Sequence, residues 1–243
     1  MTEPTPKSQL SISSAIKNSS IILLEVGAEP VKYYVHEALL SLHSDYFSKA
    51  LDSYWREGEE RRVYMTNLEL GVANVFVDWL YTQRLPNTEK LCMDIQGFKP
   101  LSDDTISVTM VILKVYVFAD RFLIPSLKSA ALRLFQDYHS INPTKQSPHL
   151  GVIIWAYENL PQEDIMLKFL INAQCRRTLK YDGGENTLQL CFDLPHEFLA
   201  RVIIEIPYYE DWERKRRYSD YFYHDHSSIS EKNNCPKGST WKW

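Results

Sequence analysis

The chain has 243 residues, of which 44% are hydrophobic and 24% charged, and its net charge at pH 7 is −4. This is ordinary globular composition, and the length is sufficient to bury a core without disulfides or metals. The slightly acidic balance argues against binding of nucleic acid or of an anionic membrane by the body of the protein. The apolar runs are too short and too interrupted by charge to span a bilayer, so we expect no membrane segment.

The cysteines and the N-terminus indicate the compartment. The four cysteines are widely spaced and form no C-x-x-C pair, at Cys92, Cys175, Cys191 and Cys235. This spacing does not predict a zinc site, and the density is too low for a disulfide framework, so we expect reduced thiols. The first 20 residues lack the apolar core of a secretory signal. We therefore predict a cytoplasmic or nuclear protein, or one found in both places, without a cofactor.

The first half of the chain alternates short strands and helices. Residues 1–18 are expected to be disordered or to form a short N-terminal helix. Alternating apolar residues predict a hairpin of strands at 21–26 and 31–35, joined by the turn at 27–30. Helical spacing from Glu37 to Leu51, broken near Ser44, predicts two short helices, with Ser44 as the N-cap of the second. A charged loop at 57–61, a third strand at 62–66 and an amphipathic helix at 72–81 follow.

The second half is expected to be helical. Residues 87–104 are polar and contain Gly97 and Pro100, which predicts a loop. Two helices are expected at about 106–119 and 126–138, with Pro125 in the first turn of the second. A helical extension over 149–206 should hold helices near 150–157, 165–173 and 198–206. The stretch 207–243 is charged and aromatic without periodicity, and we expect a disordered tail there.

Several polar residues carry the chemistry of catalytic sites, namely Ser41, His43, Ser44 and Asp45. Neighbouring helix residues point apart, and a catalytic triad requires converging side chains rather than neighbours in sequence. The chain also has no G-x-S-x-G elbow and no glycine loop of the phosphate-binding type. We therefore predict capping and surface roles for this group, and no enzymatic activity.

Three further sets of residues leave alternatives open. His36, at the junction of strand and helix, is interpreted as a side chain that satisfies a backbone group, with a titrating functional histidine as the alternative. His224, His226 and Cys235 provide fewer donors than the four that a structural zinc site needs. The basic run of the tail is a candidate nuclear import signal or RNA contact, with a solvated helix face as the alternative, at Arg214, Lys215, Arg216 and Arg217.

The order of these elements resembles the BTB/POZ domain, in particular that of fungal BTB proteins of about this length. The matching stretches are SSIILLEVG (19–27), VHEALL (35–40), SDYF (44–47), WRE (55–57), VYM (63–65), FVDWLYT (76–82) and LKVYVFAD (113–120), with Ile124-Pro125 and Leu127. The resemblance covers residues 19–138. It implies an α+β fold in which a cluster of helices caps a small three-stranded sheet, followed here by the all-helical extension.

The resemblance also implies a function in protein–protein interaction without catalysis. BTB domains associate with themselves or with another BTB protein, and many bind a cullin as adaptors of ubiquitin ligases. The cullin contact of such adaptors is a hydrophobic residue, any residue and a Glu in the loop after the second helix, a pattern that Trp55, Arg56 and Glu57 fit. The alternatives are that Trp55 packs on its own domain, and that the protein is a nuclear regulatory or transcription-associated protein acting through its basic tail.

Two positions depart from the family pattern. Many BTB domains have Asp before the first strand, where this chain has Ser20. Many have His-Lys at the junction after the second strand, where this chain has His36-Glu37. Both residue types help build a polar pocket in the animal transcription-factor dimers. The departures therefore argue against an identical pocket, but not against a dimer formed through other contacts.

Overall fold

The computed structural model describes residues 12–17, 19–52, 54–95, 97–98, 108–140, 148–175 and 185–213. The chain divides into two compact units. The first contains residues 1–99 together with 118–127, and the second contains residues 100–117 and 128–243. Two helices, Val108–Arg121 and Pro125–Ser140, therefore contribute to both units, because the turn at 122–124 and the helix ends beside it belong to the first unit.

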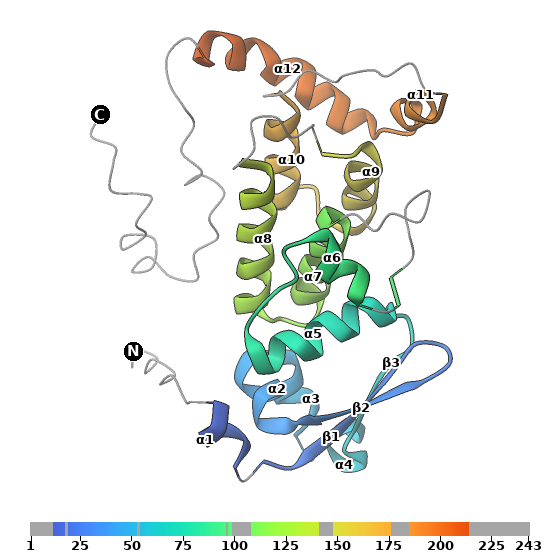
Figure 1. The fold of residues 1–243 in the computed structure, drawn as a ribbon, viewed down its shortest axis with the longest axis vertical. Coiled ribbons are helices and arrows are strands. Elements are labelled where there is room, and N and C mark those ends of the chain that lie inside the picture. The colour runs from blue at the N-terminus through green and yellow to red at the C-terminus, as the bar shows by residue number, and fades with distance from the viewer. Residues whose placement is uncertain are drawn as a thin grey trace, which may run out of the picture. The chain divides into compact units, whose positions relative to one another are not determined.

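A three-stranded sheet of order β2-β1-β3 forms the base of the first unit (Figure 1). Strand β1 (Ile21–Val26) pairs antiparallel with β2 (Val31–His36) and parallel with β3 (Arg62–Met65). Alternate residues of each strand are buried on one face: Ile22, Leu24, Val26, Val35, Val63 and Met65. The period of two places the apolar side chains on this face, so the predicted three-stranded α+β architecture is confirmed.

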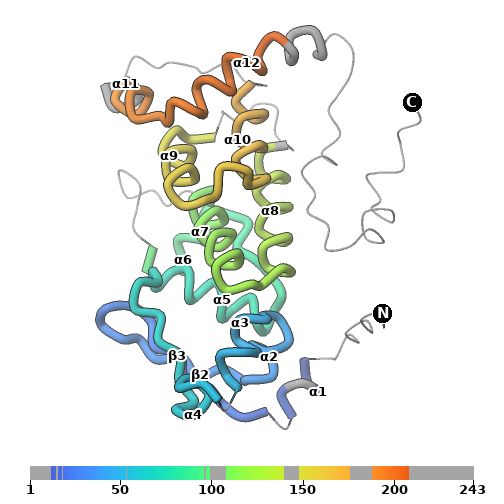
Figure 2. Tube along the Cα trace, turned by 180° about the vertical axis from the view of Figure 1, so that it is seen from behind, coloured from blue at the N-terminus to red at the C-terminus, as the bar shows by residue number. Residues whose placement is uncertain are grey.

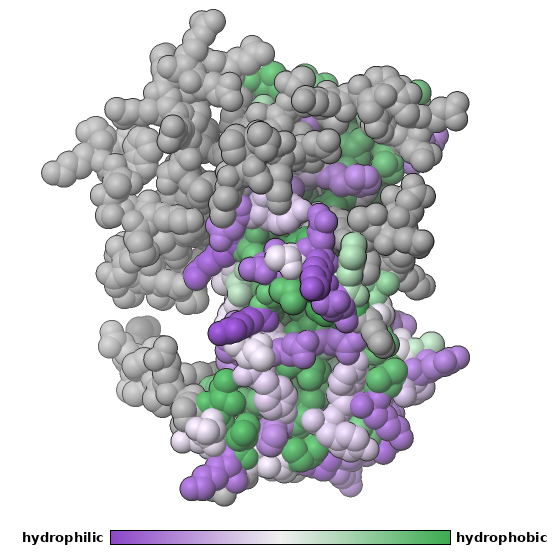
Figure 3. Space-filling model, viewed as in Figure 1, coloured by the Kyte–Doolittle hydropathy of each residue, from purple (hydrophilic) through white to green (hydrophobic). Residues whose placement is uncertain are grey.

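Among the described residues, six helices lie entirely within this unit, and most of them are short. They are α1 (Ile12–Ile16), α2 (Glu37–His43), α3 (Asp45–Ala50), α4 (Arg56–Glu60), α5 (Leu70–Thr82) and α6 (Glu89–Asp94). Their core includes a group of phenylalanines: the rings of Phe47 and Phe122 are stacked with centroids 5.5 Å apart, and Phe76 contacts Phe118 at 4.8 Å. Figure 3 shows apolar residues between hydrophilic ones on the face of this unit that is in view.

The second unit is built from helices, which Figure 2 shows from behind. They are α7 (Val108–Arg121) and α8 (Pro125–Ser140), whose facing ends belong to the first unit, then α9 (Leu150–Asn159), α10 (Ile165–Cys175), α11 (Glu185–Phe192) and α12 (His196–Glu213). Helix α10 packs against α9 and α12. Buried Phe198 of α12 meets the ring of Tyr157 at 5.9 Å.

The helices depart from the sequence prediction at four places. The segment expected as the charged loop 57–61 forms α4, and the polar stretch 87–104, expected as a loop, contains α6. Thr88 caps α6 by accepting the N–H of Leu91 at 3.3 Å. Helix α11 was not predicted, and α12 runs past residue 206 through Pro207. In the described residues, no helix is long and apolar enough to cross a membrane.

Candidate protein-interaction site

The turn that leads into α4 carries two exposed aromatic side chains. Tyr54 is 93% exposed and Trp55 is 62% exposed. The backbone beneath them is nevertheless held: the N–H of Trp55 donates to the carbonyl of Asp52 at 2.9 Å, and its carbonyl accepts the N–H of Glu59 at 3.0 Å. The alternative in which Trp55 packs on its own domain is therefore wrong, because most of the indole faces solvent on a fixed backbone.

Helix α4 is seated by a glycine. Gly58 is buried, and a Cβ at this position would lie 2.1 Å from the carbonyl oxygen of Asp52. Only a residue without a side chain allows so close an approach. The helix then ends at Arg61, which adopts the left-handed conformation with φ 55°. This seating fixes the position of the turn that presents Trp55.

Of the three residues predicted to contact a cullin, two remain available on α4. Arg56 is engaged within its own helix, where its Nε lies 2.6 Å from Oε1 of Glu60. The hydrogen bond between them raises the pKa of Arg56 and lowers that of Glu60. Glu57 is half-buried and lies two residues after Trp55, whose side chain is exposed. The structure thus places an aromatic anchor and a carboxylate on one turn, while their role with a cullin stays a prediction.

The two positions that depart from the family pattern come together in the fold. Arg61 Nη2 lies 2.5 Å from Oε2 of Glu37, and the hydroxyl of Ser20 hydrogen-bonds to both groups. The backbone N–H of Glu37 also donates to the carbonyl of Ser20 at 2.9 Å. The hydrogen bond from Arg61 lowers the pKa of Glu37. The cluster is therefore a Ser-Glu-Arg arrangement, and sequence reasoning missed its cation because Arg61 comes from the end of α4.

His36 has a different partner from the one expected. Its ring Nδ1 lies 2.9 Å from the hydroxyl of Tyr81, and its backbone N–H donates to the same hydroxyl at 3.2 Å. The prediction that the ring satisfies a backbone group is wrong, since the ring contacts a tyrosine hydroxyl of α5. One tyrosine thus anchors both the ring and the backbone of the last residue of β2.

The serine, histidine and aspartate residues of α2 and α3 serve the fold. Ser44 is buried; its hydroxyl accepts the N–H of Phe47 at 3.0 Å and donates to the carbonyl of Phe122 at 2.6 Å. The predicted N-cap is confirmed. The ring of His43 lies edge-on to Trp79 with centroids 5.0 Å apart, and burial lowers the pKa of His43. With Ser44 committed to two hydrogen bonds and His43 facing an indole, the two side chains do not form a nucleophile and base.

The remaining chemical candidates give no reactive site in the part of the chain that the structure describes. No three His, Cys, Asp or Glu side chains there gather so that they could hold a metal ion. Burial raises the pKa of the thiols of Cys92 and Cys175 to about 11, which keeps them protonated at neutral pH. The histidines and cysteine that provide too few donors for a zinc site lie outside the described residues, as does the candidate import run of the tail: His224, His226, Cys235, Arg214, Lys215, Arg216 and Arg217.

A sequence profile of the BTB/POZ domain matches residues 21–97, from the start of β1 to just beyond α6. The match therefore includes the sheet, the capped helix pair, the aromatic turn of α4 and the Ser-Glu-Arg cluster's Glu37 and Arg61. No match was found among curated proteins. The extension of the domain to residue 138 and the particular likeness to fungal members stay predictions. The chain carries a BTB/POZ domain, and domains of this family are protein–protein interaction modules.

Proposed function

We propose that this protein is a cullin adaptor: the BTB domain associates with itself or with another BTB protein, and the α4 turn contacts a cullin within a ubiquitin ligase. The observation that carries the cullin contact is the exposure of Trp55, 62%, on a backbone held from both sides. An aromatic ring presented on a fixed backbone binds with little further loss of backbone freedom, which favours a role as an interface anchor.

The carboxylate of the pattern complements this anchor. Glu57 follows Trp55 by two residues and is half-buried, so part of its carboxylate side chain is open to a donor on the partner. A charge-assisted hydrogen bond at the edge of an apolar anchor contributes orientation as well as affinity. Arg56, paired with Glu60, corresponds to the unrestricted middle position of the pattern.

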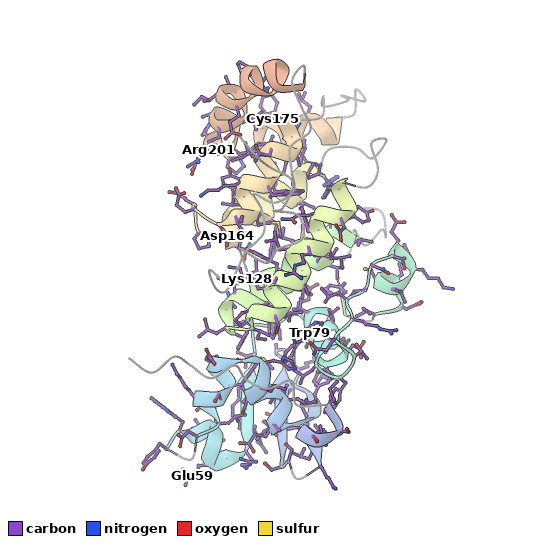
Figure 4. All side chains as sticks on the ribbon, turned by 90° about the vertical axis from the view of Figure 1, so that its left-hand side faces the viewer. Glu59, Trp79, Lys128, Asp164, Cys175 and Arg201 are labelled. Atoms are coloured by element: carbon purple, nitrogen blue, oxygen red, sulfur yellow. The ribbon has the colours of Figure 1, made fainter. Side chains whose placement is uncertain are left out.

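The test is binding of the purified protein to a purified cullin, measured by calorimetry or a quantitative pull-down. Trp55→Ala should weaken binding by roughly 30-fold or more, since truncation of a central aromatic anchor costs about 2 kcal/mol or more. Glu57→Ala should also weaken binding. Glu59→Ala is the matched control, because Glu59 is an exposed carboxylate on the same helix (Figure 4) and lies outside the pattern. Equal cullin binding by wild type, Trp55→Ala and Glu57→Ala would reject the adaptor role.

Association through the BTB domain has a separate test. Size-exclusion chromatography with light scattering should give a mass above that of the 28.5 kDa chain, rising with concentration. A monomeric mass at every concentration up to high micromolar would reject self-association, and would leave a different BTB protein as the required partner.

A second candidate function rests on the basic run from Arg214 to Arg217. We propose it as a nuclear import signal of a regulatory protein, which would place the protein in the nucleus as well as the cytoplasm. Clustered Lys and Arg residues are the composition that such signals share. A fluorescent fusion that lacks residues 214–217 should be lost from the nucleus, whereas normal nuclear entry of that fusion would remove the idea.

A further inference from the structure

Strand β2 is an edge strand in the described part of the chain, and its backbone groups alternate in direction. The backbone N–H of Glu37 donates to the carbonyl of Ser20, and in an antiparallel pair such closely bonded positions recur every second residue. Residues 33 and 35 therefore direct their N–H groups toward β1, where they face Leu24 and Ile22. Residues 32, 34 and 36 direct theirs away from the sheet.

The two ends of this outward edge are closed. The outward N–H of His36 is taken by the hydroxyl of Tyr81 at 3.2 Å. At the other end, the next position of the same parity is Pro30, which has no N–H. The outward donors that remain are those of Lys32 and Tyr34, and neither forms a hydrogen bond with any residue that the structure describes. They lie on either side of Tyr33, so the open edge is symmetric about that residue.

We propose that β2 pairs antiparallel with β2 of a second copy of this chain, centred on Tyr33, so that one continuous sheet runs through both copies. In this register Lys32 of each copy lies opposite Tyr34 of the other, and each residue donates and accepts one backbone hydrogen bond across the junction. A two-fold axis through the Tyr33 pair relates the copies, as a closed symmetric dimer requires.

Neighbouring registers use the edge less well. Pairing centred on residue 32 places the Lys32 side chains of the two copies opposite each other, where their like charges repel. It also places Tyr34 opposite Pro30, which has no N–H to donate. Pairing centred on residue 34 places Lys32 opposite His36, whose N–H is already bonded to Tyr81. Only in the register centred on Tyr33 do the N–H groups of Lys32 and Tyr34 find acceptors while the carbonyls of both residues also receive a donor.

The side chains on the outer face of the sheet agree with that register. Tyr34 is 70% exposed, and the side chain of Lys32 is 57% exposed. Directly opposed residues in an antiparallel pair have Cβ atoms about 4.5–5.5 Å apart, which brings the ammonium of one copy over the tyrosine ring of the other. Glu25 Oε1 already lies 4.0 Å from Lys32 Nζ within one copy. The same ammonium–ring contact is made twice, because of the symmetry.

This edge contact rests on the proposed self-association and adds a surface to it. A five-residue edge buries less area than the roughly 1,200 Å² of a stable interface, so it should be weak by itself and depend on concentration. If the BTB domain also associates through another face, the edge contact joins dimers into larger assemblies.

The experiment is amide hydrogen exchange on the purified full chain at low and high micromolar concentration, with the mass followed by light scattering. At high concentration the exchange rates of the Lys32 and Tyr34 amides should fall by about tenfold or more, because these amides become hydrogen-bonded across the junction. The amide of His36, bonded to Tyr81 within one copy, should not change. Tyr34→Pro should weaken association by about tenfold or more, since each copy loses a donor at a position where an edge strand accepts proline. Tyr34→Thr, which keeps the N–H and strand propensity, is the control and should weaken it less.

The outcomes separate this inference from the proposed association. A mass that rises with concentration while the exchange of Lys32 and Tyr34 stays constant would overturn the edge contact and leave self-association standing. A monomer at every concentration would overturn both. If Tyr34→Pro fails to fold, as judged by thermal unfolding, the exchange of the wild-type amides decides alone. Concentration-dependent protection confined to these two amides of β2 would support the edge contact.

Discussion

Two adjacent carboxylates before α10 should differ sharply in their contribution to stability. The side chain of Asp164 is 7% exposed and that of Glu163 is 77% exposed. Asp164 Oδ1 accepts the hydroxyl of Tyr116 and the backbone N–H of Met166, both at 2.8 Å, while its Oδ2 lies 3.5 Å from Nζ of Lys128 (Figure 4). Asp164 thus caps α10 and joins it to α7 and α8 within the second unit.

The size of the effect follows from these contacts. Asp164→Ala removes an N-cap, which costs about 1 kcal/mol. It also leaves the hydroxyl of buried Tyr116 without this acceptor, for about 1–3 kcal/mol more. We expect the free energy of unfolding to fall by about 2–4 kcal/mol. Glu163 pairs with Lys168 at 3.2 Å and with Arg201 at 3.8 Å, but such exposed pairs contribute about 0–1 kcal/mol.

The assay is urea unfolding followed by circular dichroism, with all variants compared in the same buffer. Asp164→Asn is a third variant that keeps an acceptor for Met166 and for Tyr116 while removing the charge, so it should fall between the other two. If Asp164→Ala and Glu163→Ala lower the free energy of unfolding equally, within about 0.5 kcal/mol, burial does not set the contribution of these carboxylates and the reasoning is refuted.

Three further predictions concern the first unit. Ser44→Ala should lower the free energy of unfolding by about 2 kcal/mol or more, because it removes the helix cap and the hydrogen bond to the carbonyl of Phe122. Ser48→Ala, on the exposed side of the same helix, is the control and should change it little. Equal effects of the two variants in urea unfolding would contradict this prediction. Because the pKa of Glu37 is lowered in the fold, the stability that this carboxylate contributes is complete above its unfolded pKa and is lost as pH falls through its folded pKa. Glu37→Gln should therefore reduce the loss of unfolding free energy at acid pH, measured by unfolding across pH. An unchanged pH profile would argue against the pairing with Arg61. Cys92 is buried and the pKa of its thiol is raised to about 11. In the folded protein it should therefore react with iodoacetamide at pH 8 far more slowly than after unfolding, as followed by mass spectrometry. Equal reaction rates in the two states would refute its burial.

The local structure of the first unit was predictable from sequence because short-range patterns set it. The alternation of apolar residues in 21–26 and 31–35 corresponds to the paired strands, and the Ser44 cap requires only a hydroxyl three residues before the N–H that it accepts. Helices α4 and α6 were missed because five or six residues carry too little periodicity to be distinguished from loops. In α4 the decisive feature is the buried glycine against the carbonyl of Asp52, a tertiary contact without a sequence signal.

The polar contacts of the site could not be predicted, because their partners are distant in sequence. Glu37 meets Arg61 across 24 residues, and His36 meets Tyr81 across 45. The two departures from the family pattern, Ser20 and Glu37, looked independent in sequence. In the fold both contact the same cation, Arg61, so the two departures belong to one cluster.

These contacts also decide which parts of the domain are available to partners. The histidine and serine side chains that suggested catalysis are engaged with Tyr81, Trp79 and the helix caps, so they hold the fold rather than present chemistry to solvent. What the fold leaves exposed is of another kind: the indole of Trp55 on a fixed turn, and the backbone donors of β2 on either side of Tyr33. In the two proposals, both features would serve recognition through shape and hydrogen-bonding direction. Because Tyr81 closes one end of the β2 edge while it anchors His36, the same internal contact that holds this histidine also limits the length and register of the proposed interface.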